Sequence, residues 1–478
     1  MTNYSMFLTI LYLCCFTNYL IQGRVLSIRA YNYSQSSQIS APPMEGPSPN
    51  SPNYNYAQSS PAPSPVSDDH DDKVLNVLTF GAVGDGSTDD TSAFKTAWDA
   101  ACAVDNGKIF APSGYSFLLQ PLIFSGPCKS GVLFQLEGTI VPPDGPESWP
   151  KSSSKRQWII FYRTHGLTLQ GGGLIHGRGD KWWDMPCKPH KGNGTKEHGP
   201  CDSPVAIRFF QGTNITLKGI KLMNSPEFHI RFDNCQNVNV DSLFIKSPAD
   251  SPNTDGIHVE NTINVTIHNT IISNGDDCIS IGAGSHNLDI RNVTCGPSHG
   301  ISIGSLGVHN SKACVSNITV TNCIIKHSDN GVRIKTWQGG SGSVSRITFD
   351  GIHMDTVRNP IIIDQYYCLS SSCSNQTSAV SINTITYSNI KGTFDTRGPP
   401  VKLECSDSVP CTNITISALD LLPAGPTSLM ASHRHKLDPF CWNAYGSSAG
   451  EFTTPPVDCL LEGLPYLDVP GTDDVGLC

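Results

Sequence analysis

A short repeated phrase constrains the fold of this chain more than any other feature of its sequence. Each copy is an asparagine that precedes a strand of alternating apolar residues. The copies begin at Asn214, Asn237, Asn264, Asn287, Asn317, Asn383 and Asn413. The first five are 23, 27, 23 and 30 residues apart. A repeat of this length forms one unit that buries its apolar side only by stacking on its neighbours, so the spacing predicts a solenoid.

A second phrase runs in step with the first and makes the predicted solenoid a β-helix. It reads Gly256-Ile-His-Val, Cys278-Ile-Ser-Ile, Gly300-Ile-Ser-Ile, Gly331-Val-Arg-Ile and Pro360-Ile-Ile-Ile. Two interleaved strand series with one period mean that each repeat is one coil. The sequence has few of the hairpin signals that a β-sandwich requires. We therefore predict an all-β fold, a right-handed parallel β-helix.

One helix is predicted before the repeats begin, as a short N-terminal cap on the solenoid. Asp89 or Asp90 stands where a helix-capping side chain is expected. The residues that would share one apolar face of the helix are Ala93, Phe94, Ala97, Trp98 and Ala101. No later segment shows an amphipathic helical pattern of similar length.

The chain divides into three segments by composition. Residues 1–23 contain an apolar run from Met6 to Phe16 and have the pattern of a signal peptide. Residues 24–73 are rich in Pro, Ser, Asn and Gln and have few apolar side chains to bury, which predicts a disordered spacer. Residues 74–478 are expected to form the β-helix catalytic domain. We expect the mature protein to be secreted and to have no membrane contact once the signal segment is removed.

Cysteines and glycosylation sequons agree with an oxidising compartment. Removal of Cys14 and Cys15 with the signal segment leaves 16 of the 18 cysteines. Three local pairs suggest themselves, namely Cys187 with Cys201, Cys368 with Cys373, and Cys405 with Cys411. Sequons occur at Asn32, Asn193, Asn214, Asn264, Asn292, Asn317, Asn375 and Asn413. No cysteine pairs have zinc-finger spacing, so no metal or other cofactor is predicted.

Polar residues stand at the head of the second phrase in successive repeats. Aligning these phrases places Asp255, Asp277, His299 and Asn330 at equivalent positions. Because stacked parallel strands lie about 4.8 Å apart, the four side chains should form one column. Asp276 precedes Asp277, and Arg333 and Lys335 lie on the next coil, separated by Ile334. Alternation along that strand should place both cations on the same face and Ile334 in the core.

Such crowding of carboxylates favours a catalytic site over a structural role. Proximity raises the pKa of at least one carboxyl group, and acid-base catalysis needs one carboxylic acid kept protonated and another kept ionised. Each motif alone also has a simple structural interpretation, as a turn, a satisfied histidine or a solvated strand face. Their shared register is what favours chemistry. The formal net charge of −9 argues against a nucleic-acid partner.

Four motifs in this order resemble those of polygalacturonases, the pectin-degrading family of glycoside hydrolases, and plant members above all. They are Asn253-Thr-Asp-Gly, Gly275-Asp-Asp, His299-Gly-Ile-Ser-Ile-Gly and Arg333-Ile-Lys. The resemblance extends from about Asn76 to the C-terminal cysteines and does not cover the spacer. It departs from the family pattern at Ser298, where a glycine is common, but His299 is retained.

The resemblance implies hydrolysis of α-1,4-galacturonosyl linkages with inversion. It makes Asp276 the general acid, Asp255 and Asp277 the pair that activates water, and His299 the support of the acid. The substrate-binding residues that it implies are Asn253, Arg333, Lys335 and Tyr367. Inversion requires a water between sugar and base, with carboxyl groups about 6.5–9.5 Å apart. The implied partner is pectin or homogalacturonan, outside the cell in the wall, and the implied state is a monomer.

Three other functions remain open on the sequence alone. A pectate lyase would share the coil architecture but cleave by β-elimination, usually with calcium. A hydrolase of rhamnogalacturonan or xylogalacturonan would keep the fold with altered motifs, whereas Asn253-Thr-Asp and Arg333-Ile-Lys are intact here. A non-catalytic pectin-binding wall protein would be expected to have lost Asp276 or His299, and both are present. Endo and exo action are not distinguished.

Overall fold

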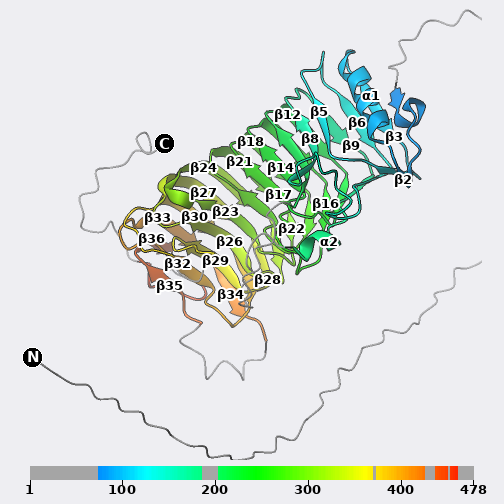
Figure 1. Cartoon of the computed structure of the whole chain (residues 1–478). Helices are drawn as coiled ribbons and strands as arrows, with labels where there is room; N and C mark the ends of the chain where they lie inside the picture. Colours follow the sequence, from blue (N-terminus) through cyan, green and yellow to red (C-terminus); the bar gives the residue numbers. More distant parts are fainter. Residues whose placement is uncertain (1–73, 186–202, 370–372, 426–436, 450–452, 461–477) are drawn as a thin grey trace, which may run out of the picture. The chain divides into compact units, whose positions relative to one another are not determined.

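Three long parallel sheets form the folded part of the protein (Figure 1). A computed structural model describes residues 74–185, 203–369, 373–425, 437–449, 453–460 and 478. Within these residues the sheets contain 13, 12 and 11 strands, and every strand pairs in parallel with strands of the neighbouring coils. The parallel β-helix predicted from the sequence is confirmed. The predicted signal segment and spacer lie outside the described residues.

Each sheet takes one strand from each coil. The 13-stranded sheet contains β1 (Val74–Asn76), β3 (Lys108–Ala111), β6 (Leu133–Leu136), β9 (Thr168–Gln170), β12 (Thr213–Lys218), β15 (Gln236–Asp241), β18 (Ile263–His268), β21 (Ser285–Arg291), β24 (Lys312–Thr321), β27 (Ser341–Asp350), β30 (Ser381–Ser388), β33 (Cys411–Ser417) and β36 (Ala444–Ala449). The 12-stranded sheet contains β2 (Asp85–Asp89), β4 (Ser116–Leu118), β7 (Thr139–Val141), β10 (Leu174–His176), β13 (Lys221–Met223), β16 (Phe244–Lys246), β19 (Ile271–Ser273), β22 (Thr294–Cys295), β25 (Ile324–Lys326), β28 (His353–Val357), β31 (Lys391–Phe394) and β34 (Asp420–Pro423). The 11-stranded sheet contains β5 (Leu122–Ser125), β8 (Gln157–Tyr162), β11 (Val205–Phe210), β14 (Ile230–Asp233), β17 (Ile257–Glu260), β20 (Ile279–Ile281), β23 (Ile301–Leu306), β26 (Asn330–Thr336), β29 (Asn359–Asp364), β32 (Val401–Glu404) and β35 (Phe440–Trp442).

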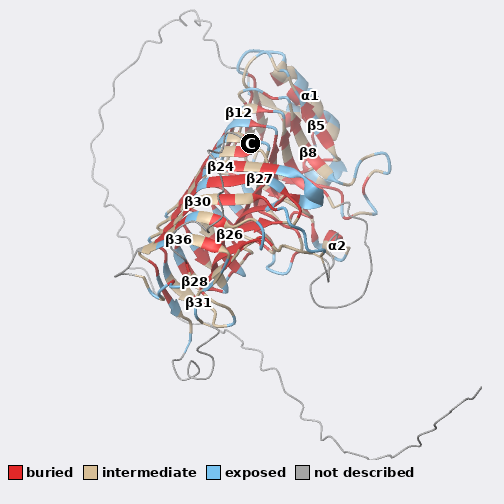
Figure 2. Cartoon of the chain, turned by 90° about the vertical axis from the view of Figure 1, so that its left-hand side faces the viewer, coloured by how far each residue is buried: buried red, intermediate tan, exposed pale blue. Residues whose placement is uncertain are grey.

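Buried residues alternate with more exposed ones along many strands, as the sequence pattern requires (Figure 2), and the buried side chains of successive coils stack in the core. In the 11-stranded sheet, Phe161, Phe209 and Phe232 stack on one another with ring centroids 5.1 and 5.0 Å apart. Val259 and Ile281 continue this row in the next coils. Burying one such side chain contributes about 1.5–3 kcal/mol, so the stack fixes the register of every coil strongly.

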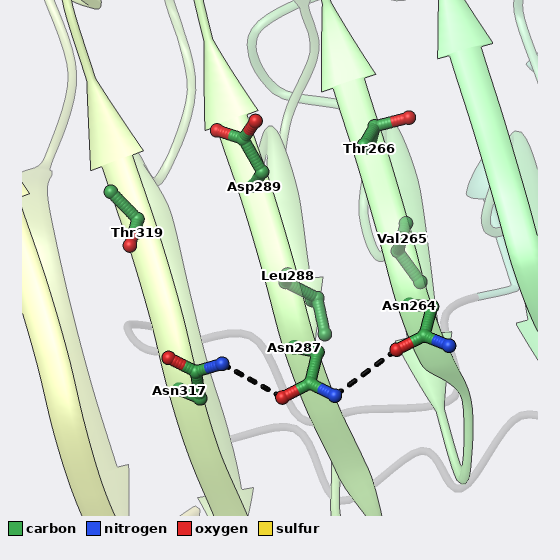
Figure 3. Close-up of a pocket in the computed structure, with 8 residues that line it drawn as sticks. All are labelled: Asn264, Val265, Thr266, Asn287, Leu288, Asp289, Asn317 and Thr319. Carbon is green, nitrogen blue, oxygen red and sulfur yellow. Dashed lines mark hydrogen bonds between the residues drawn. The ribbon is translucent and has the colours of Figure 1, made fainter.

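The asparagines of the first phrase form a hydrogen-bonded ladder on the outside of the 13-stranded sheet. Asn264 donates to Asn237 over 3.0 Å. Asn287 donates to Asn264 over 3.0 Å, and Asn317 donates to Asn287 over 2.8 Å (Figure 3). Each lies in the left-handed region, with φ between 55° and 61°. Asparagine suits this position because it tolerates a positive φ and its amide both donates and accepts.

The predicted helix is α1 (Thr91–Cys102), which follows β1 and β2 in the chain, and all five residues of its predicted apolar face are buried. Of its two candidate capping residues, Asp89 accepts a hydrogen bond from the Thr91 backbone over 3.0 Å. Asp90 turns away and accepts from the backbone of Val83 and Gly84. A second, short helix, α2, spans Asp180–Trp183, and 3-10 turns span Val77–Phe80 and Val308–Asn310. Among the described residues, no helix is long and apolar enough to cross a membrane.

Disulfides close local loops and pin one chain end to the solenoid. The predicted pairs Cys368–Cys373 and Cys405–Cys411 are confirmed, whereas Cys187 and Cys201 lie outside the described residues. The other bonds are Cys102–Cys128, Cys278–Cys295, Cys314–Cys478 and Cys441–Cys459. Cys235 and Cys323 are buried free thiols. The even number of cysteines therefore does not mean that all of them are paired.

Candidate active site

The polar column lies at the start of four neighbouring strands of the 11-stranded sheet. Register pairs Ile257 of β17 with Ile279 of β20, Ile279 with Ile301 of β23, and Ile301 with Val332 of β26. Residues two positions before each of these are therefore also aligned. They are Asp255, Asp277, His299 and Asn330. The structure thus brings together, on consecutive coils, side chains that are far apart in sequence.

Backbone hydrogen bonds between coils hold the residues of this column. The carbonyl of Asp255 accepts from the His229 amide over 2.8 Å, and the carbonyl of Asp277 accepts from the Gly256 amide over 2.9 Å. The carbonyl of Asp276 accepts from the His299 amide over 2.7 Å. Each aspartate backbone is therefore fixed by a neighbouring coil as well as by its own.

Asp277 is buried and surrounded by donors. Lys335 Nζ donates to Asp277 Oδ2 over 2.7 Å, and Arg333 Nη2 donates to Asp277 Oδ1 over 2.7 Å. Ser302 Oγ donates to the same Oδ1 over 2.8 Å. Burial alone would raise the pKa of Asp277, but the charges of Lys335 and Arg333 outweigh it and hold the pKa below its usual range. Asp277 is therefore kept ionised.

Asp276 projects beside Asp277 and pairs with the column histidine. Its Oδ1 lies 3.1 Å from Nδ1 of His299, whose side chain is 37% exposed, and the other ring nitrogen lies 3.8 Å from Asp329. Burial opposes a charge on His299, but the hydrogen bond to Asp276 and the nearby carboxylates prevail and raise its pKa. The two aspartates thus have different environments, which acid-base catalysis requires.

Asp255, on the preceding coil, is the third aspartate of the site. Its Oδ2 accepts a hydrogen bond from Ser280 Oγ over 2.6 Å, and Nδ1 of His258 lies 2.8 Å from the same hydroxyl. His258 stacks on Phe228 and lies 3.7 Å from Glu260. Burial lowers the pKa of His258, so its imidazole is neutral near neutral pH.

A cavity of about 240 Å³, which we call the carboxylate pocket, opens over these groups. Its lining includes Asp255, Asp276, Asp277, Lys335 and Tyr367. Lys335 Nζ lies 5.4 Å from the centroid of the Tyr367 ring, so the predicted subsite tyrosine is close to the predicted cation.

Two further predicted site residues, Arg333 and Asn253, do not line the carboxylate pocket themselves. Arg333 contacts the pocket through its bond to Asp277 and is mostly buried. Asn253 is buried in the turn before β17, at φ 54°, and is not among the residues that line the carboxylate pocket. Ile334 is fully buried between Arg333 and Lys335, as the strand alternation predicts.

A second hollow, of about 510 Å³, lies against the asparagine ladder (Figure 3). Asp289 is the one charged residue of its lining, and the ladder amides that border it bond to one another. Groups that satisfy each other in this way offer no activated acid or base. The chemistry of the described residues is therefore concentrated in the carboxylate pocket.

The carboxylate pocket also has side chains of metal-ligating type. Oxygens of Asp276 and Asp277 and a ring nitrogen of His299 lie within 4.8 Å of one another. However, both oxygens of Asp277 are engaged by the cationic side chains Arg333 and Lys335. These cations balance the charge that a metal ion would otherwise balance, so the donor set fits proton transfer better than metal binding.

Sequence reasoning missed the residues that hold the aspartates. Ser280, Ser302 and His258 are not in the predicted set, yet they bond directly to Asp255 or Asp277 or to a residue that does so. A signal for them exists. They occupy the third position of the second phrase, where strand alternation makes side chains face outward next to the column.

Comparisons with known proteins identify the family of the chain and agree with its fold. The sequence model of the family "Glycosyl hydrolases family 28" matches residues 102–436. A probable polygalacturonase of Arabidopsis thaliana is 44% identical over 400 residues, which are 83% of this chain and 86% of that protein. Polygalacturonase-2 of Solanum lycopersicum is 44% identical over 73% of this chain and 75% of its own length. The crystal structure of a polygalacturonase from Erwinia carotovora has a TM-score of 0.61 with 22% identity and covers 81% of this chain and 99% of that chain.

Proposed function

The chain belongs to the glycosyl hydrolases of family 28, and from that premise we propose how its carboxylate pocket cleaves polygalacturonic acid. The protein is a glycoside hydrolase that acts on pectic polysaccharide. Asp276 is the general acid that protonates the glycosidic oxygen. Asp255 and Asp277 hold and deprotonate the attacking water, and His299 supports the acid.

The observation that carries this proposal is the contrast between two adjacent aspartates. Asp277 is buried against Arg333 and Lys335 and is held as an anion. Asp276, next to it, bonds instead to His299. Asp277, held as an anion, is suited to accept a hydrogen bond from the attacking water. Asp276 shares a proton with His299 and can pass it to the leaving oxygen, which is the asymmetry that inverting hydrolysis requires.

Arg333 and Lys335 have two functions in this proposal. They neutralise Asp277 through the two ion pairs. When substrate is bound, we propose that they also recognise a galacturonate carboxylate beside Tyr367, which lines the pocket together with Lys335. These cations explain how a protein with a net charge of −9 binds a polyanion. Asn253, in the turn that leads into β17, remains a proposed substrate-binding residue, although it does not line the carboxylate pocket.

The stereochemistry of the product tests the mechanism. Proton NMR of the first product formed from polygalacturonate should show the β anomer, because water attacks opposite to the α linkage. An α anomer appearing first would mean a covalent intermediate and would overturn the assignment of Asp255 and Asp277 as water-activating residues.

The identity of the products tests the function itself. Wild-type protein should release saturated oligogalacturonates or galacturonic acid from polygalacturonate, and an Asp276→Asn variant prepared in parallel should release almost none. Products with an unsaturated end that absorb in the ultraviolet would indicate a lyase. Binding of polygalacturonate without any product would indicate a non-catalytic wall protein. Sizing at short times also separates endo action, which gives mixed oligomers, from exo action, which gives small products.

We propose secretion to the plant cell wall as the site of action. Support comes from the signal-like segment 1–23 and from the disulfides, which form in oxidising compartments. A fluorescent fusion at the C-terminus should be found in the wall, and deletion of residues 2–23 should retain it inside the cell.

A further inference from the structure

We propose that Ser280 and His258 are positioning residues for Asp255, forming a relay in which the imidazole donates to the serine hydroxyl and the hydroxyl donates to the carboxylate. This inference rests on the proposed function, because it assigns a role to Asp255 in activating water. It adds two residues to the site that sequence analysis did not select.

The direction of each hydrogen bond follows from the acceptor at its end. Ser280 Oγ lies 2.6 Å from Asp255 Oδ2, and an ionised carboxylate accepts but does not donate. The single hydroxyl proton of Ser280 is therefore used on Asp255. His258 Nδ1, 2.8 Å from the same oxygen, must then carry its proton and donate it to the serine.

Strand pairing builds the relay into the backbone. His258 of β17 and Ser280 of β20 are directly paired in the parallel sheet. Ser280 is buried and Asp255 is nearly so. A hydroxyl fixed in this way restricts rotation of the carboxylate and favours its charged form, because a hydrogen bond to the charged form lowers a pKa.

The next coil repeats the serine–aspartate contact at the same position of its strand. Ser302, paired with Ser280, donates to Asp277 Oδ1 over 2.8 Å and accepts from Arg333 Nε over 3.0 Å. Each serine thus donates to an aspartate of the preceding coil, and each is itself supported by a nitrogen donor. Because the contact occurs in two successive coils, we interpret it as a regular feature of the site.

Several other titratable groups face Asp255, and the test must take them into account. His229 of the preceding coil contacts its backbone carbonyl, and burial lowers the pKa of that imidazole to about 4, so it stays neutral. Glu260 lies beyond His258, and Asp276 and Asp277 stand on the next coil. None of these is altered by a change at Ser280.

The experiment compares two serines in the same local geometry. Ser316 of β24 is paired with His286 of β21, and its hydroxyl lies 2.9 Å from His286 Nδ1, on the 13-stranded sheet away from the site. Ser316→Ala therefore controls for the loss of a strand hydroxyl bonded to histidine. The pH dependence of kcat and KM on polygalacturonate is measured for the wild type, Ser280→Ala, Ser280→Thr and Ser316→Ala.

We expect Ser280→Ala to lower kcat about tenfold and to change KM less than about twofold. The acidic limb of its kcat-pH profile should lie about one pH unit higher than that of the wild type. The sign follows because Asp255 without its donor has a higher pKa and loses its ionised form at higher pH. Ser280→Thr should restore the limb, and Ser316→Ala should match the wild type.

Two results overturn the relay: an unchanged acidic limb in active Ser280→Ala enzyme, or an equal defect in Ser280→Thr. If Ser280→Ala does not fold, His258→Leu provides the same test, since it removes the donor one step away and should shift the limb in the same direction by less. An inactive wild type would instead overturn the proposed hydrolysis, and this inference with it.

Discussion

The same coils of this protein present two polar columns of opposite character. On the 13-stranded sheet, Asn264, Asn287 and Asn317 each bond to an identical neighbour. On the 11-stranded sheet, Asp255 and Asp277 stand at the equivalent edge among histidine, serine and cationic side chains. Both columns are built by the same stacking of parallel coils, but the asparagine column contains neutral amides and the aspartate column contains charged and titratable groups.

The difference shows how a solenoid separates stability from function. Identical amides satisfy one another at every step, so that column can be extended along the chain without unpaired groups. Identical carboxylates would repel one another, so the other column is interrupted by His299 and neutralised by Arg333 and Lys335. Changes in the mixed column should therefore affect activity, and changes in the uniform column should affect stability.

Replacing the proposed acid should have the largest effect. Asp276→Asn should lower kcat by about 10²–10⁴-fold, the range typical of general acid catalysis, because the amide cannot deliver a proton to the leaving oxygen. Steady-state kinetics measure the loss of kcat, and equilibrium binding to polygalacturonate measures the affinity separately. Binding and thermal stability should stay near those of the wild type, and a variant that retained full activity would remove the central assignment.

Breaking the ion pairs of Asp277 should have the next largest effect. Lys335→Met and Arg333→Gln should each lower kcat/KM on polygalacturonate by about 10–100-fold, because both substrate and Asp277 lose a charged partner. The defect should shrink on methyl-esterified pectin, which has no carboxylate to pair. Equal affinity of both variants and the wild type for polygalacturonate would contradict carboxylate recognition.

The same variants should change acid stability in a defined direction. The folded pKa of Asp277 is depressed, so its ion pairs stabilise the fold above the unfolded pKa, and this stabilisation is lost as pH falls through the folded pKa. Acid-unfolding curves followed by circular dichroism should therefore shift to higher pH in Lys335→Met. A curve that coincides with the wild type would show that the pair adds nothing to stability.

Removing the histidine should have a milder effect that depends on pH. The pKa of His299 is raised, so its charged form persists to higher pH than that of an ordinary histidine, and wild-type activity should fall as pH rises through that value. His299→Ala should lose about tenfold in kcat and should lack this limb. The measurement is the pH dependence of the rate for the wild type and for His299→Ala. If the basic limb is unchanged in the variant, a group other than His299 causes that limb.

Changing the asparagine ladder should leave catalysis intact. Asn287→Gly keeps a residue that tolerates φ 61° but removes two side-chain hydrogen bonds, so the free energy of unfolding should fall by about 1 kcal/mol. Asn287→Ala should cost about 1–2 kcal/mol more, because it adds backbone strain. Denaturant unfolding measures both, and kcat/KM of each should equal that of the wild type.

Register explains why much of this molecule could be predicted from its sequence. The spacing of the asparagine phrases and the second strand phrase determines which residues stack, so the coil and the column of Asp255, Asp277 and His299 follow from counting. The apolar face of α1 follows equally from helical spacing. These features depend on backbone periodicity, which a single sequence records.

Side-chain partners could not be predicted in the same way. Arg333 and Lys335 were expected to face substrate, and in the structure both bond to Asp277, because a buried carboxylate attracts the nearest cations. Capping by Asp89 and not Asp90 depends on side-chain rotation that the sequence leaves open. Cys314 and Cys478 form a disulfide although they are 164 residues apart, and no local spacing in the sequence indicates such a pair.

The backbone bonds that cross between coils at Asp255, Asp276 and Asp277 leave the site without a hinge. Because a neighbouring coil holds the backbone of each aspartate, the electrostatic arrangement exists before substrate arrives. Reorganisation during a catalytic cycle should then fall on the polysaccharide more than on the backbone of the site. Local opening of such a site needs separation of neighbouring coils, so heat should abolish activity and the solenoid together, with no earlier loss of activity.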